Sequence, residues 1–326
     1  MSPADPVSPT PRIALGVEYL GTQYCGWQFQ HHALSVQQVL EQALAKVADQ
    51  PIRVHCAGRT DAGVHATGQV VHFEPPVERP ERAWTLGVNA NLPDDVAVRW
   101  ARPVEADFHA RFSAMARHYR YLILRRPVRS ALWHRRALWT HRSLAVAPMQ
   151  EAAAALVGRH DFTSYRALAC QAKSPVRTLH YLDLIERGDL LELRVGADGF
   201  LHHMVRNLVG VLLAIGRRDR PASWAAELLA QKDRARGGVT APAHGLYLVR
   251  VDYPDAFGLP SDLEDLSLEA RPAADLKPDD RGPGRNVPGA GGAGSNGPDN
   301  GRPGDRGPGE TRPGDGGPDE NGLAVI

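Results

Sequence analysis

The chain has 326 residues, 43% of them hydrophobic, which is enough for two ordinary domains with buried cores. Lys and Arg number 38 against 37 Asp and Glu, and the absence of any run of 18 apolar residues excludes a predicted membrane span. The three cysteines, Cys25, Cys56 and Cys170, form no C-x-x-C pair, which argues against a disulfide framework and a cysteine zinc site. We expect a cytoplasmic protein without membrane attachment.

Residues 12–105 are predicted to form a first α/β domain, preceded by a disordered segment over 1–11. Its expected elements are, in chain order, a strand over 12–20, a helix over 36–47 behind the N-cap Ser35, strands over 52–56 and 69–73, a helix over 82–90 and a strand over 96–104. This β-α-β-β-α-β order is that of a split ferredoxin-like domain.

Residues 106–255 are predicted to form a second domain of similar elements. These are a strand over 118–124, a helix over 148–157, a hairpin of strands over 177–185 and 190–195, helices over 201–215 and 222–231, and a closing strand over 246–253. The predicted fold is therefore α/β (α+β), with two ferredoxin-like or RRM-like subdomains whose antiparallel or mixed sheets flank a basic active-site cleft.

Charge is divided unevenly along the chain. Residues 256–326 hold 7 basic and 13 acidic side chains, which leaves 31 basic and 24 acidic ones in the first 255 residues. The C-terminal segment is also rich in Gly and Pro and has no aromatic residue after Phe257, so we predict a disordered acidic tail. A basic body suits a polyanionic partner, although an excess of this size also occurs as ordinary variation.

The segment Ala57–Ala66 connects two predicted strands and carries the most distinctive chemistry. Gly58 and Gly63 allow a polymer to approach the backbone closely, and Arg59 and Asp61 place a cation and a carboxylate two residues apart. From the residues alone, a functional loop and a turn in which Asp61 bonds local amides both remain open.

Gly58–Ala66, with the sequence GRTDAGVHA, resembles the signature of the TruA family of tRNA pseudouridine synthases. Similarity to that family continues in the same order along about residues 12–254. The further segments that carry it are Tyr24–Gln28, Phe108–Ala114, Arg117–Tyr121, His160–Tyr165, His203–Asn207 and Ala241–Leu248.

The resemblance implies isomerisation of uridine to pseudouridine at positions 38, 39 and 40 of the tRNA anticodon stem-loop. The N-glycosidic bond breaks, the uracil turns, and its C5 rejoins the sugar. Because no atoms are gained or lost, we expect no cofactor and no metal. The resemblance also implies a homodimer that binds one tRNA across both subunits.

Three catalytic residues follow from matching positions in the family motifs. Asp61 aligns with the essential aspartate, as nucleophile or base. Tyr119 aligns with the tyrosine that stacks on the flipped base and could relay a proton, and Arg206 with the arginine that keeps the aspartate ionised. Without the resemblance, Tyr119 would be interpreted as a core aromatic and Arg206 as a solvated side chain.

Substrate contacts are implied in the same way. Arg59 matches the residue thought to enter the stem when the base is extruded, and Leu246 the apolar wall of the base pocket. The residues of two segments match tRNA contacts: Phe108, His109, Ala110, Arg111, Phe112, Ala169, Cys170, Gln171, Ala172 and Lys173.

Other functions remain as alternatives. A non-catalytic RNA-binding protein would share the basic surface. A metal hydrolase would use His202 and His203 with His65 and His72, although adjacent histidines diverge on a helix and no H-E-x-x-H motif occurs. A glycosidase would need a second carboxylate. The tail is either a passive extension or a segment that occupies the cleft and weakens tRNA binding.

Overall fold

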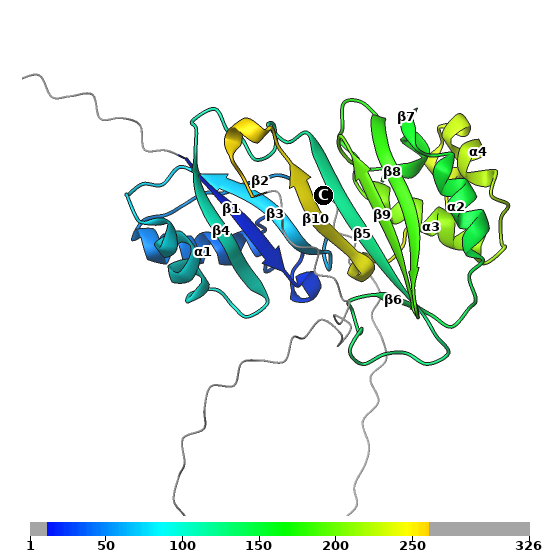
Figure 1. Cartoon of the computed structure of the whole chain (residues 1–326), viewed down its shortest axis with the longest axis horizontal. Helices are drawn as coiled ribbons and strands as arrows, with labels where there is room; N and C mark the ends of the chain where they lie inside the picture. Colours follow the sequence, from blue (N-terminus) through cyan, green and yellow to red (C-terminus); the bar gives the residue numbers. More distant parts are fainter. Residues whose placement is uncertain (1–11, 261–326) are drawn as a thin grey trace, which may run out of the picture. The chain divides into compact units, whose positions relative to one another are not determined.

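The structure, a computed structural model, describes residues 12–260. The predicted N-terminal disorder and nearly all of the predicted tail lie outside this range. One ten-stranded, mostly antiparallel sheet runs through it (Figure 1), in the order β4-β1-β3-β10-β5-β9-β8-β7 with β2 on β3 and β6 on β5. No helix in residues 12–260 has the length and apolar character needed to cross a membrane.

Ten strands and four α-helices make up the regular structure of the described residues. The strands are β1 (Arg12–Tyr19), β2 (His55–Cys56), β3 (His65–Phe73), β4 (Val96–Val104), β5 (Ala116–Arg125), β6 (Leu138–Thr140), β7 (Gly158–Asp161), β8 (Val176–Arg187), β9 (Leu190–Ala197) and β10 (Leu246–Asp252). The helices are α1 (Val36–Ala48), α2 (Val146–Ala154), α3 (Met204–Gly216) and α4 (Trp224–Gln231), with a π-helical turn over Ala83–Gly87.

The predicted mixed α/β class is confirmed, and so is the β-α-β-β-α-β order of the first half. The N-cap of α1 is present, because the Gln38 N–H donates to the Ser35 hydroxyl over 3.3 Å. The strand expected over 52–56 is limited to two residues, and the short strands β6 and β7 were not predicted. Strands of two to four residues are too short to show a hydrophobic period.

The last strand, β10, lies at the centre of the sheet. It pairs in parallel with β3 through Tyr247 and Leu248, and antiparallel with β5 on its other side. The sheet is therefore continuous between the two halves of the chain, and the boundary predicted at residue 105 stays a prediction. This arrangement brings the start of β3, the middle of β5 and the start of β10 side by side.

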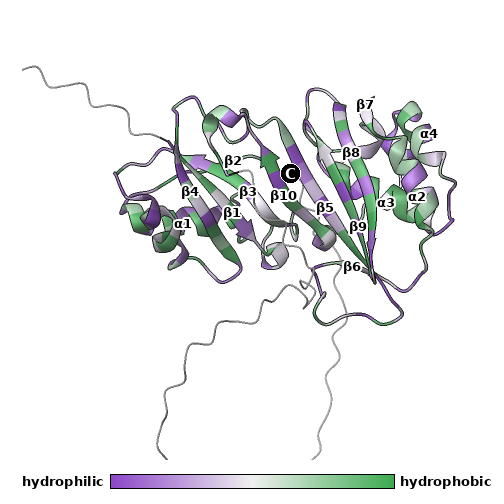
Figure 2. Cartoon of the chain, viewed as in Figure 1, coloured by the Kyte–Doolittle hydropathy of each residue, from purple (hydrophilic) through white to green (hydrophobic). Residues whose placement is uncertain are grey.

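Helices pack near both ends of the sheet. Figure 1 shows α1 beside β1 and β4, and α2, α3 and α4 beside β8 and β9. Leu40 and Leu44 of α1 are completely buried, and Figure 2 shows hydrophobic colour along much of α3 and β9. Since burying one such side chain contributes about 1.5–3 kcal/mol, these contacts hold the helices firmly against the sheet.

Candidate active site

Asp61 lies on the loop between β2 and β3, and this loop is fixed by side chains of the sheet. Gln69 of β3 donates through Nε2 to the Gly58 carbonyl over 2.6 Å. The Thr60 hydroxyl lies 2.8 Å from the hydroxyl of Tyr19 on β1, and both side chains are buried. Two of the three residues just before Asp61 are thus anchored to two neighbouring strands.

Gly26 supports the loop from the other side. Its φ is +87°, in the left-handed region, and a Cβ there would lie 2.7 Å from the Thr60 carbonyl oxygen. The same carbonyl accepts the Trp27 N–H over 3.0 Å. Only glycine meets both requirements at this position.

We expect Gly26→Ala to lower the free energy of unfolding by about 2–4 kcal/mol, because left-handed strain adds to a steric overlap. Gly188→Ala is the matched control: Gly188 also has positive φ, 56°, but a Cβ added there would meet no atom within 4 Å. We expect Gly188→Ala to lower the free energy of unfolding by about 1 kcal/mol. Urea denaturation measures both, and equal losses would show that the contact with Thr60 is unimportant.

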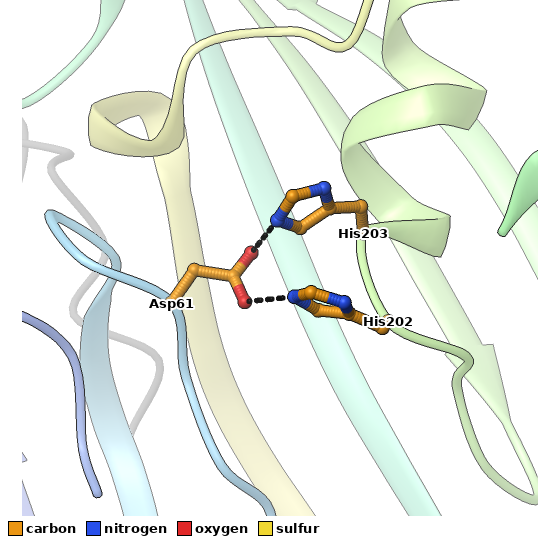
Figure 3. Close-up of side chains that lie close together, drawn as sticks. All are labelled: Asp61, His202 and His203. Carbon is orange, nitrogen blue, oxygen red and sulfur yellow. Dashed lines mark ion pairs between the residues drawn. The ribbon is translucent and has the colours of Figure 1, made fainter. Parts of the chain in front are cut away.

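Three side chains surround the Asp61 carboxylate. Arg206 Nη1 lies 3.0 Å from Oδ2. His202 Nε2 lies 3.4 Å from Oδ1, and His203 Nε2 lies 3.4 Å from Oδ2 (Figure 3). All three come from the start of α3 and the turn before it, so a single segment of the described chain supplies the polar partners of this carboxylate.

These partners determine the charge of Asp61. Burial on its own would raise the pKa of the carboxyl group. The interaction with His202, the nearby charge of His203, and the contact with Arg206 together outweigh the effect of burial. The pKa of the Asp61 carboxyl group is therefore below its usual value. Asp61 is therefore ionised at neutral pH although its side chain is only 25% exposed.

Arg206 is itself held in place. Its Nε donates to the Ala241 carbonyl over 2.8 Å, while the Ala241 N–H donates to the Arg206 carbonyl over 3.0 Å. Its side chain is 16% exposed. The resemblance placed Arg206 beside Asp61, and in the structure the two side chains are in contact.

The two histidines approach Asp61 together because they precede the helix. α3 begins at Met204, and His203 adopts a left-handed conformation with φ 60°, which costs a non-glycine residue about 1 kcal/mol. The ring centroids of His202 and His203 are 4.0 Å apart. The expectation that adjacent histidines diverge here was wrong, because it placed both of them within a helix from residue 201.

One group of side chains in residues 12–260 could hold a metal ion, namely Asp61, His202 and His203. Their potential ligand atoms all lie within 4.8 Å of one another. The predicted alternative of a metal hydrolase needed His65 and His72 as well. His65 Nδ1 instead accepts the Gly21 N–H, and His72 stacks on another histidine. Because the Arg206 cation lies 3.0 Å from the same carboxylate, the arrangement suits an anion held by donors better than a metal.

Tyr119 lies on β5, nearly buried, with its ring edge against Phe200 at a centroid distance of 5.0 Å. Burial, and then the charge of Asp61, raise its pKa well above the usual value, so its hydroxyl stays protonated. Leu246 begins β10 next to β5, opposite Tyr121 in the register, and is also buried. The phenol of Tyr119 thus lies within range of the charge on Asp61, and Leu246 lies on the strand next to that of Tyr119.

The family model for tRNA pseudouridine synthase matches residues 16–113 and 152–254. Asp61 falls in the first range and Arg206 in the second. The chain belongs to the tRNA pseudouridine synthase family.

Individual members of this family are similar over most of their length. The chain is 58% identical to the tRNA pseudouridine synthase A of Pseudomonas aeruginosa over 250 residues, which cover 76% of this chain and 88% of the relative. It is 57% identical to that of Nitrosococcus oceani over 249 residues, covering 76% and 96%. Identity to that of Salmonella arizonae is 53% over 253 residues, covering 78% and 94%.

The segment 108–112, matched to tRNA contacts in the family, has two kinds of side chain. Phe108 and Ala110 are completely buried, whereas Phe112 is 76% exposed with the Arg111 guanidinium 5.5 Å from its ring centroid. His109 packs on Phe112 with ring centroids 4.4 Å apart. Of these residues, Arg111 and Phe112 present surface that a ligand can reach.

The other predicted contacts lie on surface near the site. Arg59, two residues before Asp61, is exposed. In the second segment Ala169, Gln171 and Lys173 are exposed, and Cys170 and Ala172 are half-buried. The chain just before this second segment is tied to the site, since the Ala167 N–H donates to the His202 carbonyl over 2.8 Å.

Sequence reasoning missed several neighbours of the site. His202 and His203 were considered as metal ligands only, and Phe200 was not considered. An open pocket of about 530 Å³ adjoins the loop at Ala62 and Gly63. Its lining includes Arg129 and Arg135, and the density of arginine in 125–142, six in eighteen residues, could have indicated it.

Proposed function

We propose that this chain isomerises uridine to pseudouridine at positions 38, 39 and 40 of the tRNA anticodon stem-loop, with Asp61 as the reacting carboxylate. The observation that carries the proposal is the ionised Asp61 held 3.0 Å from Arg206 in a chain of this family. Two of the relatives named above, both tRNA pseudouridine synthases, are matched by this chain over 88% and 96% of their own length.

The chemistry requires one anionic group at the sugar. The bond from C1′ to N1 breaks and a bond from C1′ to C5 forms, after which the proton on C5 leaves. Asp61 either attacks C1′ or removes a proton to promote elimination, and both routes require the carboxylate form. A carboxylate also stabilises positive charge that develops on the sugar.

Tyr119 is proposed to stack on the flipped base and to relay the C5 proton. Because its pKa is raised, it acts as a hydroxyl that accepts one proton while passing on its own, and not as a phenolate.

We expect Tyr119→Phe to slow pseudouridine formation about 10²-fold, the lower range of acid–base catalysis, and to leave the fold intact, since the ring contact with Phe200 is kept. Tyr165→Phe is the matched control, because its hydroxyl donates to Ala225 away from Asp61. Single-turnover rates distinguish the two. Equal rates for wild type and Tyr119→Phe would exclude the relay.

Binding of tRNA is proposed to come mainly from cations around the site. Arg59, Arg111 and Lys173 are exposed, and Arg129 and Arg135, which line the pocket beside the loop, are exposed as well. Contacts to phosphates supply affinity without sequence reading, and the target base is recognised after flipping. We also propose that the protein works in the cytoplasm as a homodimer that grips one tRNA across both subunits.

Incubation of the purified chain with an unmodified tRNA transcript, in the presence of a chelator, tests the proposed function. Mapping should show pseudouridine at positions 38 to 40, with no free uracil. Binding without any new nucleoside would support the RNA-binding alternative. Release of uracil would indicate a glycosidase, and loss of activity with chelator would indicate a metal enzyme.

A further inference from the structure

Each oxygen of the Asp61 carboxylate faces its own imidazole (Figure 3). His202 Nε2 lies 3.4 Å from Oδ1, and His203 Nε2 the same distance from Oδ2. Within residues 12–260, neither ring makes a hydrogen bond or ion pair to any other group. The two side chains thus have one polar partner in common.

The backbone is shaped to bring both rings to this point. His203 has φ 60° and ψ 5°, a conformation that suits glycine. Hydrogen bonds fix it on both sides: the Met204 N–H donates to the Leu201 carbonyl over 2.9 Å, and the Asn207 N–H to the His203 carbonyl over 2.9 Å. A strained residue that carries a side chain directed at a reactive group points to use of that side chain.

Arg206 alone does not fix the orientation of the carboxylate. Its Nε is occupied by the Ala241 carbonyl, and Nη1 reaches only Oδ2. A single contact on one oxygen leaves the carboxylate free to rotate about the Cβ–Cγ bond. A contact on Oδ1, which His202 Nε2 makes at 3.4 Å, limits that rotation, and His203 adds a further contact on Oδ2.

We propose that His202 and His203 are positioning residues that hold the two oxygens of Asp61 in the orientation needed to attack or deprotonate the nucleotide. This inference rests on the proposed function, since it assumes that Asp61 reacts. It assigns the histidines no contact with the nucleotide.

The test uses substitutions that separate the ring from the backbone. His203→Gly keeps the left-handed conformation and removes only the imidazole. His202→Ala removes the other ring, and His202→Gln restores an N–H donor at a similar reach. His180→Gln, an exposed histidine on β8, is the matched control. Binding and single-turnover rates are measured on anticodon stem-loop RNA.

We expect His203→Gly and His202→Ala each to reduce the rate constant about 10²-fold, the cost of a misplaced reacting group, with RNA affinity unchanged. His202→Gln should recover part of the loss. If His203 serves only to shape the backbone, His203→Gly will react at the wild-type rate, and that result, or wild-type rates for both variants, overturns the inference. An inactive wild-type protein overturns the proposed function instead, and the inference with it.

Discussion

Replacing Arg206 with lysine should lower kcat/KM for pseudouridine formation about 10²-fold and move the acid limb of the pH profile to higher pH. A lysine carries one ammonium group, which cannot reach both the Ala241 carbonyl and Asp61 Oδ2 as the guanidinium does. Loss of one preorganised contact of this kind typically lowers the catalytic rate about 10²-fold or more.

The direction of the pH shift follows from the groups around Asp61. Burial raises the pKa of Asp61, and His202, His203 and Arg206 lower it more. Weakening the Arg206 contact raises the pKa again. Because the carboxylate is the active form, activity is present above this pKa and lost as the pH falls through it, so the variant loses activity at a higher pH than wild type.

Arg102→Lys serves as the control, because Arg102 forms a surface ion pair with Glu81 on half-exposed side chains. It should change neither the rate nor the profile. Rates across the pH range, at concentrations of tRNA well below KM, give the comparison. An Arg206→Lys enzyme whose acid limb coincides with that of wild type would show that Arg206 does not set the ionisation of Asp61.

Local patterns predicted many of the elements but not their pairing. The amphipathic helix α1 follows from its hydrophobic period, since one of its faces lies in the core. Alternation also indicates the strand β1, although residues 13–17 are all buried, so both faces of this strand are covered. The central place of β10 in the sheet does not follow from any such pattern. Its alternation shows that it is a strand, while its partners β3 and β5 are selected by contacts between residues more than a hundred positions apart.

Around the candidate site, the motif indicated Asp61, and the resemblance indicated Arg206. The histidines were misjudged because the apolar stripe of α3 begins at Leu201, so the helix was expected three residues before it starts at Met204. A histidine at position 203 does not predict a left-handed backbone conformation, since glycine and asparagine are the residues that usually adopt it. Side-chain geometry at a helix boundary therefore had to come from the structure.

Replacing Asp61 with asparagine should abolish the reaction with little effect on binding. The amide has the same shape and its oxygen can still accept from Arg206, so the fold should be kept. It lacks the charge needed to attack or to remove a proton, and we expect a loss of about 10⁴-fold or more. Affinity for tRNA should change less than about threefold, because phosphate contacts are spread over the surface.

Asp183→Asn on β8 is the matched control, since Asp183 is exposed on a strand away from the loop. It should react and bind as wild type does. A melting curve for each protein verifies that the variants are folded.

Single-turnover conversion of an unmodified tRNA by wild-type and Asp61→Asn protein, with binding measured on the same preparations, is the most direct test of Asp61 as the reacting group. The prediction is bound tRNA without pseudouridine for the variant and complete conversion for wild type. Pseudouridine formed by folded Asp61→Asn protein at the native rate would contradict it.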